Sequence, residues 1–311
     1  MVVMPYPIVD IRSWKILSVE EMGSKPKFWV QEPGGPKWLF KHRHRPNVGD
    51  DWAEKIAAEV AETLAIPHAT VELARYQDMP GIISKDLVGT ASPRELVLGN
   101  SLLVEADPTY PQMNRYHVAE HTIDRVFTAL GADYIDLPEE SPRDSAIQSP
   151  PDLFVGYLLL DALIGNTDRH HENWAILQFA PTDNQRRAVL SPTFDHASSL
   201  AHGLTDEERT RRLATRDRRY SVAAYVRKAR SGFYSAQGDR RPLSTLDAFR
   251  EAENRCLDAG TFWQEQLRNL DAGILEKIVS QVPDEIMSQT SKKFASALLT
   301  CNRSALSAET R

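Results

Sequence analysis

The feature that most constrains the fold is a polar run at residues 164–173, followed by an aspartate farther along the chain. Asp168 and Asn173 stand five positions apart in this sequence, and Asp195 directly follows a phenylalanine. An aspartate and an asparagine at this spacing are common by chance, so the flanking residues decide what the run means. Those residues predict regular elements on both sides, and these elements fix where the three polar side chains lie.

A buried helix leads into the polar run. Residues 151–164 carry apolar side chains at steps of three and four, as a core-facing helix requires. Ser149 is expected to cap the N-terminus, with Pro150 and Pro151 at the first helical positions, where a missing N–H is tolerated. Gly165 begins the dipeptide that ends the helix. The polar run therefore forms a loop directly after a buried helix.

Two short strands follow the loop. Residues 174–177 and 188–190 are apolar, and a polar turn at residues 181–184 separates them. The second strand runs toward Asp195. This order of helix, loop, strand, turn and strand predicts a hairpin with the three polar side chains at one end.

Such a set of side chains suits phosphoryl transfer from ATP. One carboxylate orients the acceptor hydroxyl, while an asparagine and a second aspartate hold the Mg²⁺ that neutralises the triphosphate. The same step from Asp to Asn occurs in the catalytic loop of protein kinases. The combination of Asp168, Asn173 and Asp195 therefore predicts an ATP-dependent kinase with Mg²⁺ as its metal.

The composition is that of an ordinary globular protein. The 311 residues are 41% hydrophobic and 26% charged, enough for one large or two medium domains. The net charge of −6 argues against direct binding of nucleic acid. Cys256 and Cys301 lie far apart and are expected to be reduced thiols. Because no signal peptide or spanning apolar run is evident, we expect a cytoplasmic protein without a membrane partner.

The first 86 residues predict a β-rich unit with one helix. Strands are expected at residues 14–19, 28–30, 38–41, 69–74 and 81–84. The helix is expected to run from Asp50 as its cap to about residue 65, because its apolar side chains recur at a step of four.

The rest of the chain, residues 87–311, is expected to be mainly helical. Helices are predicted at residues 94–104, 118–130, 151–164, 206–213, 246–257 and 275–299. An arginine-rich segment at residues 209–241 is expected to be an exposed face or loop, and residues after 300 are expected to fray. Together the two parts predict an α+β fold with two lobes, a β-rich N-lobe (1–86) and a mainly α-helical C-lobe (87–311).

With these segments in hand, the chain resembles the HipA-like serine/threonine kinases, and most of all the short HipT-like and CtkA-like forms. The segments that carry the resemblance are residues 39–41, 52–59, 66–67, 164–174 and 191–200. The resemblance implies a two-lobed protein-kinase-like fold and transfer of the ATP γ-phosphate to a serine or threonine hydroxyl of a protein.

The resemblance also implies roles for single residues. Asp168 matches the catalytic base, and Asn173 and Asp195 match the magnesium ligands. Lys41 matches the lysine that contacts the ATP phosphates, and Glu54 matches the helix carboxylate that positions this lysine.

Further roles follow from the resemblance in the N-lobe. Glu59 lies on the same predicted helix as Glu54, so the choice between them as the partner of the lysine stays open. Gly23 and Ser24 fall in the expected phosphate-covering loop, and Ser24 is a candidate for autophosphorylation. The linker whose backbone would meet the adenine matches Ser84, Lys85, Asp86 and Leu87.

The resemblance implies partners as well. The protein substrate is expected to be an aminoacyl-tRNA synthetase or another translation factor, in a toxin–antitoxin setting. An antitoxin, or a separately encoded subunit that supplies an N-terminal subdomain present in longer relatives, is a candidate partner.

Three other classes remain as alternatives. A kinase-shaped scaffold would bind a nucleotide without transferring phosphate. The order Asp168-Arg169-His170 is also similar to the catalytic loop of phosphoinositide-type lipid kinases, which would change the acceptor. A metal hydrolase would use nitrogen and oxygen ligands from Asp168, His170, Asp195 and His196.

Overall fold

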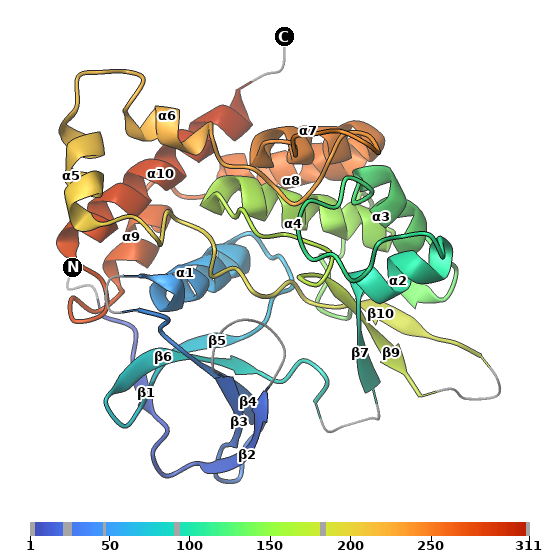
Figure 1. The fold of residues 1–311 in the computed structure, drawn as a ribbon, viewed down its shortest axis with the longest axis horizontal. Coiled ribbons are helices and arrows are strands. Elements are labelled where there is room, and N and C mark those ends of the chain that lie inside the picture. Colours follow the sequence, from blue (N-terminus) through green and yellow to red (C-terminus); the bar gives the residue numbers. More distant parts are fainter. Residues whose placement is uncertain (1–3, 21–26, 46–47, 90–93, 181–184, 309–311) are drawn as a thin grey trace.

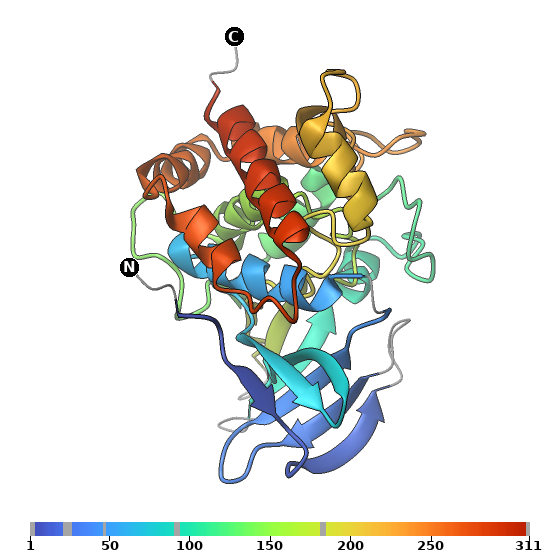
Figure 2. The ribbon, with the colours of Figure 1, turned by 90° about the vertical axis from the view of Figure 1, so that its left-hand side faces the viewer.

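The computed structural model describes residues 4–20, 27–45, 48–89, 94–180 and 185–308. In this part, a β-rich N-terminal sheet adjoins a mainly helical C-terminal part, which confirms the predicted α+β class (Figure 1). Figure 2 shows the sheet on one side of helix α1 and most of the other helices on its opposite side. Gly23 and Ser24, predicted to cover the nucleotide phosphates, lie outside the described residues.

The N-terminal sheet contains the predicted strands and one more. Its strands pair in the order β1-β5-β6-β4-β3-β2, antiparallel except for β1 with β5. Their bounds are β1 Ile8–Asp10, β2 Lys15–Glu20, β3 Lys27–Gln31, β4 Lys37–His42, β5 Val71–Tyr76 and β6 Met79–Lys85. Strand β1 was not predicted, because three residues are too few to show a period. Val30 and Phe40 are fully buried and anchor the small core on one face of this sheet.

Helix α1, Asp50–Thr63, connects this sheet to the helical part. It contacts β5 and β6 on one side and α4 and α9 on the other. The cap is Gly49, so Asp50 is the first helical residue and not the cap as predicted. Asp50 and Asp51 lie in the first turn, where carboxylates interact favourably with the positive end of the helix dipole.

A second sheet contains the predicted hairpin. Its order is β7-β9-β10-β8, with bounds β7 Arg94–Leu98, β8 Ile135–Asp136, β9 Ala175–Phe179 and β10 Ala188–Leu190. Strands β9 and β10 are antiparallel, as the sequence predicts. The helix predicted at residues 94–104 is wrong in its first half, because β7 pairs with β9. Helix α2, Gly99–Ala106, then begins where a Cβ on Gly99 would lie 2.2 Å from the Trp174 ring.

Helix α4, Pro150–Ile164, lies at the centre of the helical part. It contacts α3, α7, α8 and α10 and is buried over most of its length. Ser149 caps it as predicted, and its N–H donates to Asp152 Oδ2 at 2.9 Å. The surrounding helices are α3 Ile123–Leu130, α5 Asp206–Ala214, α6 Val222–Val226, α7 Thr245–Arg255, α8 Leu257–Asn269, α9 Ile274–Ser280 and α10 Gln289–Ser307.

Several helix predictions are corrected here. The helix predicted at residues 118–130 begins only at Ile123. The helix predicted at residues 275–299 is two helices, because Pro283 lies between α9 and α10 and cannot continue a helix. Of the residues after 300, which were predicted to fray, those up to Ser307 belong to α10, and Leu306 is 1% exposed. Helices α6 and α8 were not predicted, and the arginine-rich segment includes the buried Arg209.

Within the described ranges, no helix has the length and apolar character needed to cross a bilayer.

Candidate active site

A buried ion pair holds the loop that follows α4. Gly165 ends the helix in the left-handed region, with φ 65°, which glycine adopts without steric strain. Arg169 then reaches back to Asp161 of α4, where its Nε donates to Oδ2 and its Nη2 donates to Oδ1, both at 2.8 Å. These side chains are 1% and 4% exposed. A pair this deeply buried fixes the path of the loop, because separating the charges would leave one of them uncompensated.

The loop brings Asp168 and Asn173 together. Asn173 Nδ2 donates to the backbone oxygen of Asp168 at 2.6 Å. Arg169 Nη1 donates to the backbone oxygen of Asn173, also at 2.6 Å. Ser198 Oγ lies within 3.4 Å of Asp168 Oδ2, to which it donates. The hydrogen bond from Nδ2 therefore fixes the orientation of the Asn173 amide. The amide oxygen is the atom that could bind a metal ion.

Lys41 joins the N-terminal sheet to the loop that carries Asp195. Its Nζ lies 3.0 Å from Glu54 Oε1 and 3.2 Å from Asp195 Oδ1. Glu59 instead pairs with Lys55, at 2.7 Å. In the structure the partner of Lys41 on α1 is thus Glu54, the choice that the sequence left open. Asp195 itself has φ 58°, a conformation that aspartate tolerates better than most residues and that recurs at functional sites.

Two lysines face each other across neighbouring strands. Lys27 of β3 and Lys41 of β4 are directly paired in register. Burial and then the charge of Lys41 lower the pKa of Lys27. Burial acts in the same direction on Lys41, but the charges of Asp195 and Glu54 outweigh it and raise its pKa, so Lys41 is a cation at neutral pH. Like charges placed opposite each other are destabilising, and an anion bound between them would relieve the repulsion.

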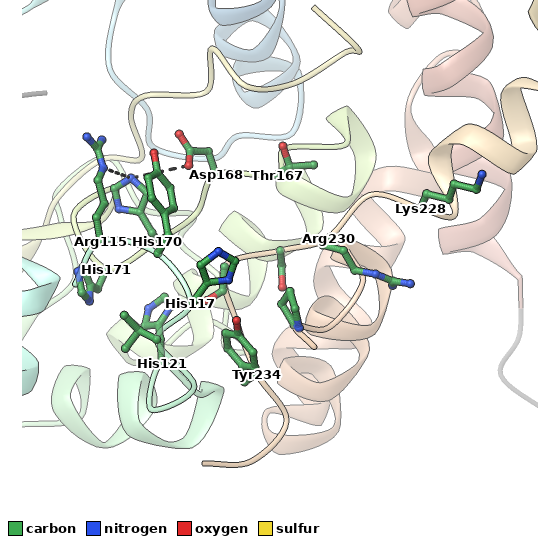
Figure 3. Close-up of a pocket in the computed structure, with 15 residues that line it drawn as sticks. Arg115, His117, His121, Thr167, Asp168, His170, His171, Lys228, Arg230 and Tyr234 are labelled. Carbon is green, nitrogen blue, oxygen red and sulfur yellow. Dashed lines mark hydrogen bonds and ion pairs between the residues drawn. The ribbon is translucent and has the colours of Figure 1, made fainter. Parts of the chain in front are cut away.

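Three neighbouring cavities of the described residues share Arg115 in their lining. A first cavity of about 360 Å³ is lined by Trp29, Leu39 and Leu98 together with Lys41, Asn173 and Asp195. A second, of about 220 Å³, shares Lys41 and Asp195 with it and adds Glu54, Asp168 and Ser198. A third, of about 320 Å³, is lined by Asp168 but not by Lys41 or Asp195 (Figure 3). The first combines apolar walls with cations and metal-ligand atoms, as a nucleotide would require.

The predicted linker lines the first cavity. Ser84, Lys85, Asp86 and Leu87 all belong to its wall. The N–H of Lys85 donates to Thr70 O at 2.9 Å. The N–H of Asp86 donates to the Lys37 carbonyl at 3.0 Å. Since these two amides are used within the sheet, a base in this cavity would have to meet other backbone groups of the linker.

The donor set of the site suits Mg²⁺. Among the described residues, no group of three or more His, Cys, Asp and Glu side chains is placed to hold a metal ion, so the ligand set of the hydrolase alternative is not assembled in them. His196 Nε2 is instead bonded to Thr193 Oγ1 at 2.9 Å, and burial lowers the pKa of His196. Asn173 and Asp195 suit Mg²⁺, which takes one or two protein oxygens and fills its other positions with water and phosphate.

Arg115, which lines all three cavities, was not predicted from the sequence. Its Nε donates to His170 Nε2 at 2.9 Å and lies 3.3 Å from Glu172 Oε2. Arg115 lies in an irregular segment between α2 and α3, where no periodic pattern marks a functional position. Lys27 was missed for a similar reason, because its role depends on its cross-strand neighbour Lys41.

Known structures share this fold. No protein-family model matches the sequence, and neither does any curated protein compared with it. The structure of CtkA, a proinflammatory kinase from Helicobacter pylori, matches with a TM-score of 0.73 at 20% identity, over 96% of this chain and 94% of that chain. HipA, from a toxin–antitoxin system of Shewanella oneidensis MR-1 and solved with HipB and operator DNA, matches with a TM-score of 0.54 at 12% identity.

These two matches confirm, at the level of the fold, the resemblance found in the sequence. The match to HipA covers 98% of this chain but 65% of that chain. The present chain therefore has a HipA/CtkA-like, kinase-like fold.

Proposed function

We propose that the protein is a Mg²⁺- and ATP-dependent serine/threonine protein kinase. The observation that carries this proposal is the bridge from Glu54 through Lys41 to Asp195, next to Asp168 and Asn173, where the cavities meet. This arrangement supplies each of the parts that phosphoryl transfer uses: a cation for the phosphates, oxygen ligands for a metal and a carboxylate for the acceptor.

Each residue has a defined task in this proposal. The first cavity holds ATP, with the base between Trp29, Leu39 and Leu98. Lys41, held by Glu54, contacts the α- and β-phosphates. For this contact the ammonium of Lys41 leaves its present partner Asp195, whose carboxylate then becomes available as a metal ligand.

Asp168 acts on the acceptor. Its carboxylate accepts a hydrogen bond from the acceptor hydroxyl and directs the oxygen toward the γ-phosphorus. The new oxygen–phosphorus bond forms as the bond to the β-phosphate oxygen breaks; the hydroxyl proton passes to Asp168 and ADP leaves. Mg²⁺, when bound by Asn173 and Asp195, supplies positive charge that offsets the charge of the triphosphate.

The acceptor and the setting rest on the resemblance. We propose a protein hydroxyl, with an aminoacyl-tRNA synthetase or another translation factor as the first class to test and Ser24 as the candidate for autophosphorylation. The neighbour HipA was solved with HipB in a toxin–antitoxin system. An antitoxin-like partner and a cytoplasmic location are therefore part of the same proposal.

The test compares the native chain with Asp168→Asn, which keeps the shape of the side chain and removes its charge. Both proteins are incubated with MgATP, alone and with dephosphorylated casein, and phosphate is counted by intact mass. We expect transfer by the native chain and a loss of at least about 10²-fold in the variant, the contribution of one general base. Asp217→Asn, an exposed aspartate remote from the cavities, is the matched control.

Three results would contradict the proposal. Equal transfer by Asp168→Asn would remove Asp168 from the chemistry. ATP binding by the native chain without transfer to itself, to casein or to any protein in a cell lysate would favour the nucleotide-binding scaffold. Transfer to phosphoinositide vesicles but not to protein would favour the lipid kinase.

A further inference from the structure

The third cavity is lined by Asp168, which does not line the nucleotide cavity. It shares Asp168, Arg115 and Tyr116 with the second cavity, but not Lys41 or the metal-ligand residues. Figure 3 shows Asp168 and Arg115 at one end of the cavity, with His117 and Tyr234 farther along and Arg230 and Lys228 at the other end. A group bound here would reach the carboxylate of Asp168 without crossing the nucleotide cavity.

The walls of this cavity are cationic. Arg115, Lys228 and Arg230 line it, and in the described part of the chain Asp168 is the one carboxylate among its lining residues. Arg115 is paired with Glu172. Within the described ranges, neither Lys228 nor Arg230 forms an ion pair with a carboxylate. The far end of the cavity therefore carries positive charge that forms no ion pair with a carboxylate in the described part of the chain.

Three buried histidines of the cavity add hydrogen-bonding atoms. Burial lowers the pKa of His121 and of His170 to about 3, and that of His171 to about 4, so these three are neutral at physiological pH. His171 Nε2 is buried without a hydrogen-bond partner among the described residues. These three side chains therefore leave the positive charge of the arginines and the lysine unchanged.

Both walls are fixed relative to the loop that carries Asp168. His121 Nδ1 donates to Gly232 O at 2.9 Å, and the N–H of Tyr234 donates to His121 O at 3.0 Å. A Cβ on Gly232 would lie 2.5 Å from the backbone oxygen of Arg169. The backbone that follows Arg230 therefore packs directly against the loop that carries Asp168.

We propose that this cavity binds the acceptor protein and selects hydroxyls that are flanked by an acidic side chain, whose carboxylate is bound by Arg230 and Lys228. The inference rests on the proposed kinase activity and names the substrate class of that site. A hydroxyl at Asp168 would place the neighbouring residues of the acceptor in the cavity. A carboxylate there would be attracted by both cations and would gain charge-assisted hydrogen bonds.

The test uses four serine peptides in one neutral background, with Glu, phosphoserine, Ala or Lys at the positions flanking the acceptor. We expect kcat/KM for the Glu peptide to exceed that for the Lys peptide by about tenfold, as two partly exposed charge contacts would give. The double variant Lys228→Glu/Arg230→Glu is expected to reverse this order. Arg240→Glu/Arg241→Glu carries the same change of charge on exposed residues outside the cavity and is expected to keep the native order.

Other outcomes of the peptide assay would contradict either the acidic preference or the kinase activity. Equal rates on the Glu, Ala and Lys peptides, or an unchanged order in the double variant, would show that the cavity does not select acidic acceptors. A preference for phosphoserine of more than about tenfold over Glu would assign the cavity to phosphate instead of carboxylate. Either result leaves the proposed function standing if casein is phosphorylated, whereas no transfer to casein or peptides would contradict the proposed function itself.

A second measurement does not depend on transfer. Fluorescence anisotropy of a labelled Glu peptide with the native chain and with Lys228→Glu/Arg230→Glu reports binding alone. We expect the double variant to weaken binding by about tenfold, with the native affinity falling as salt increases. Equal affinities would overturn the inference even if the variant had lost activity for another reason.

Discussion

The ion pair between Asp161 and Arg169 offers a quantitative test of how the candidate site is held. Asp161→Asn keeps the size of the side chain and removes its charge. In the native protein, Asp161 Oδ1 accepts from Arg169 Nη2 and from Asn166 Nδ2, both at 2.8 Å, and Oδ2 accepts from Arg169 Nε at 2.8 Å. In the variant, the NH₂ group of the asparagine would face an N–H donor of Arg169 or Asn166 where the native protein has a carboxylate oxygen that accepts.

The expected loss of stability follows from the burial of this pair. Arg169 is 1% exposed and Asp161 4%, so the guanidinium that is left has no water to replace its lost partner. Removing one member of a buried pair costs about 3–5 kcal/mol, and we expect the free energy of unfolding to fall by this amount. Arg169 also donates to the backbone oxygen of Asn173, so the loop and its phosphotransfer activity are expected to be lost together.

The assay is urea unfolding at neutral pH, followed by circular dichroism and tryptophan fluorescence. The control is Asp217→Asn, which breaks an exposed pair with Arg219, whose side chains are 48% and 91% exposed. Exposed pairs contribute about 0–1 kcal/mol, so this variant is expected to stay close to the native stability. A loss below about 1 kcal/mol in Asp161→Asn would refute the reasoning that the buried pair fixes the loop.

Three further predictions follow from the same geometry. Glu54→Gln is expected to lower the rate of phosphate transfer at least about tenfold, since it releases the lysine of β4, whereas Glu59→Gln on the same helix is expected to stay within about twofold; steady-state kinetics compare them. Gly232→Ala is expected to cost about 1–3 kcal/mol in urea unfolding, because its Cβ meets backbone, while Gly203→Ala, with nothing within 4 Å, is expected to cost less than about 0.5 kcal/mol. His121, with a pKa lowered to about 3 by burial, stays neutral in the folded state while the unfolded state takes up a proton below pH of about 6.5. The stability that the neutral His121 contributes is therefore complete above that pH and is lost as the pH falls. In the native protein this one histidine makes the unfolding free energy change by about 1.4 kcal/mol per pH unit between about pH 6 and 4. His121→Gln is expected to remove this part of the pH dependence, which urea unfolding at several pH values would measure.

The regular elements that the sequence predicted well have a clear period or cap. Helix α4 has a serine cap, prolines at its start and Gly165 at its end. The elements predicted wrongly lack such signals. Residues 94–98 form a short apolar run whose strand pairing depends on β9, a segment far along the chain. The helix predicted at residues 275–299 ignored Pro283, and the buried end of α10 could not be distinguished from a frayed terminus by sequence alone.

The candidate site was predictable where its residues lie close in sequence. Asp168 and Asn173 belong to one loop, and the helix and strands predicted on both sides of it indicated that their side chains lie close together. Arg115 gave no such signal, because its place is set by His170 and Glu172, which it meets only in the folded chain. The third cavity was not predicted for the same reason, because Arg230 lies in a segment that comes near Asp168 only by packing against the loop.

Positive side chains lie in two different cavities that border Asp168 or its neighbours. On one side of Asp168, Lys27 and Lys41 are forced together by the register of β3 and β4. On the other side, Lys228 and Arg230 line a cavity with no carboxylate at its far end among the described residues. A fold selected for stability alone has no need to place like charges opposite each other, since such pairs are destabilising. An anion bound beside Lys27 would reduce this repulsion, and an anion bound at the far end of the third cavity would offset the charge of Arg230 and Lys228. In the proposed function Asp168 would then lie between a nucleotide and an acidic acceptor.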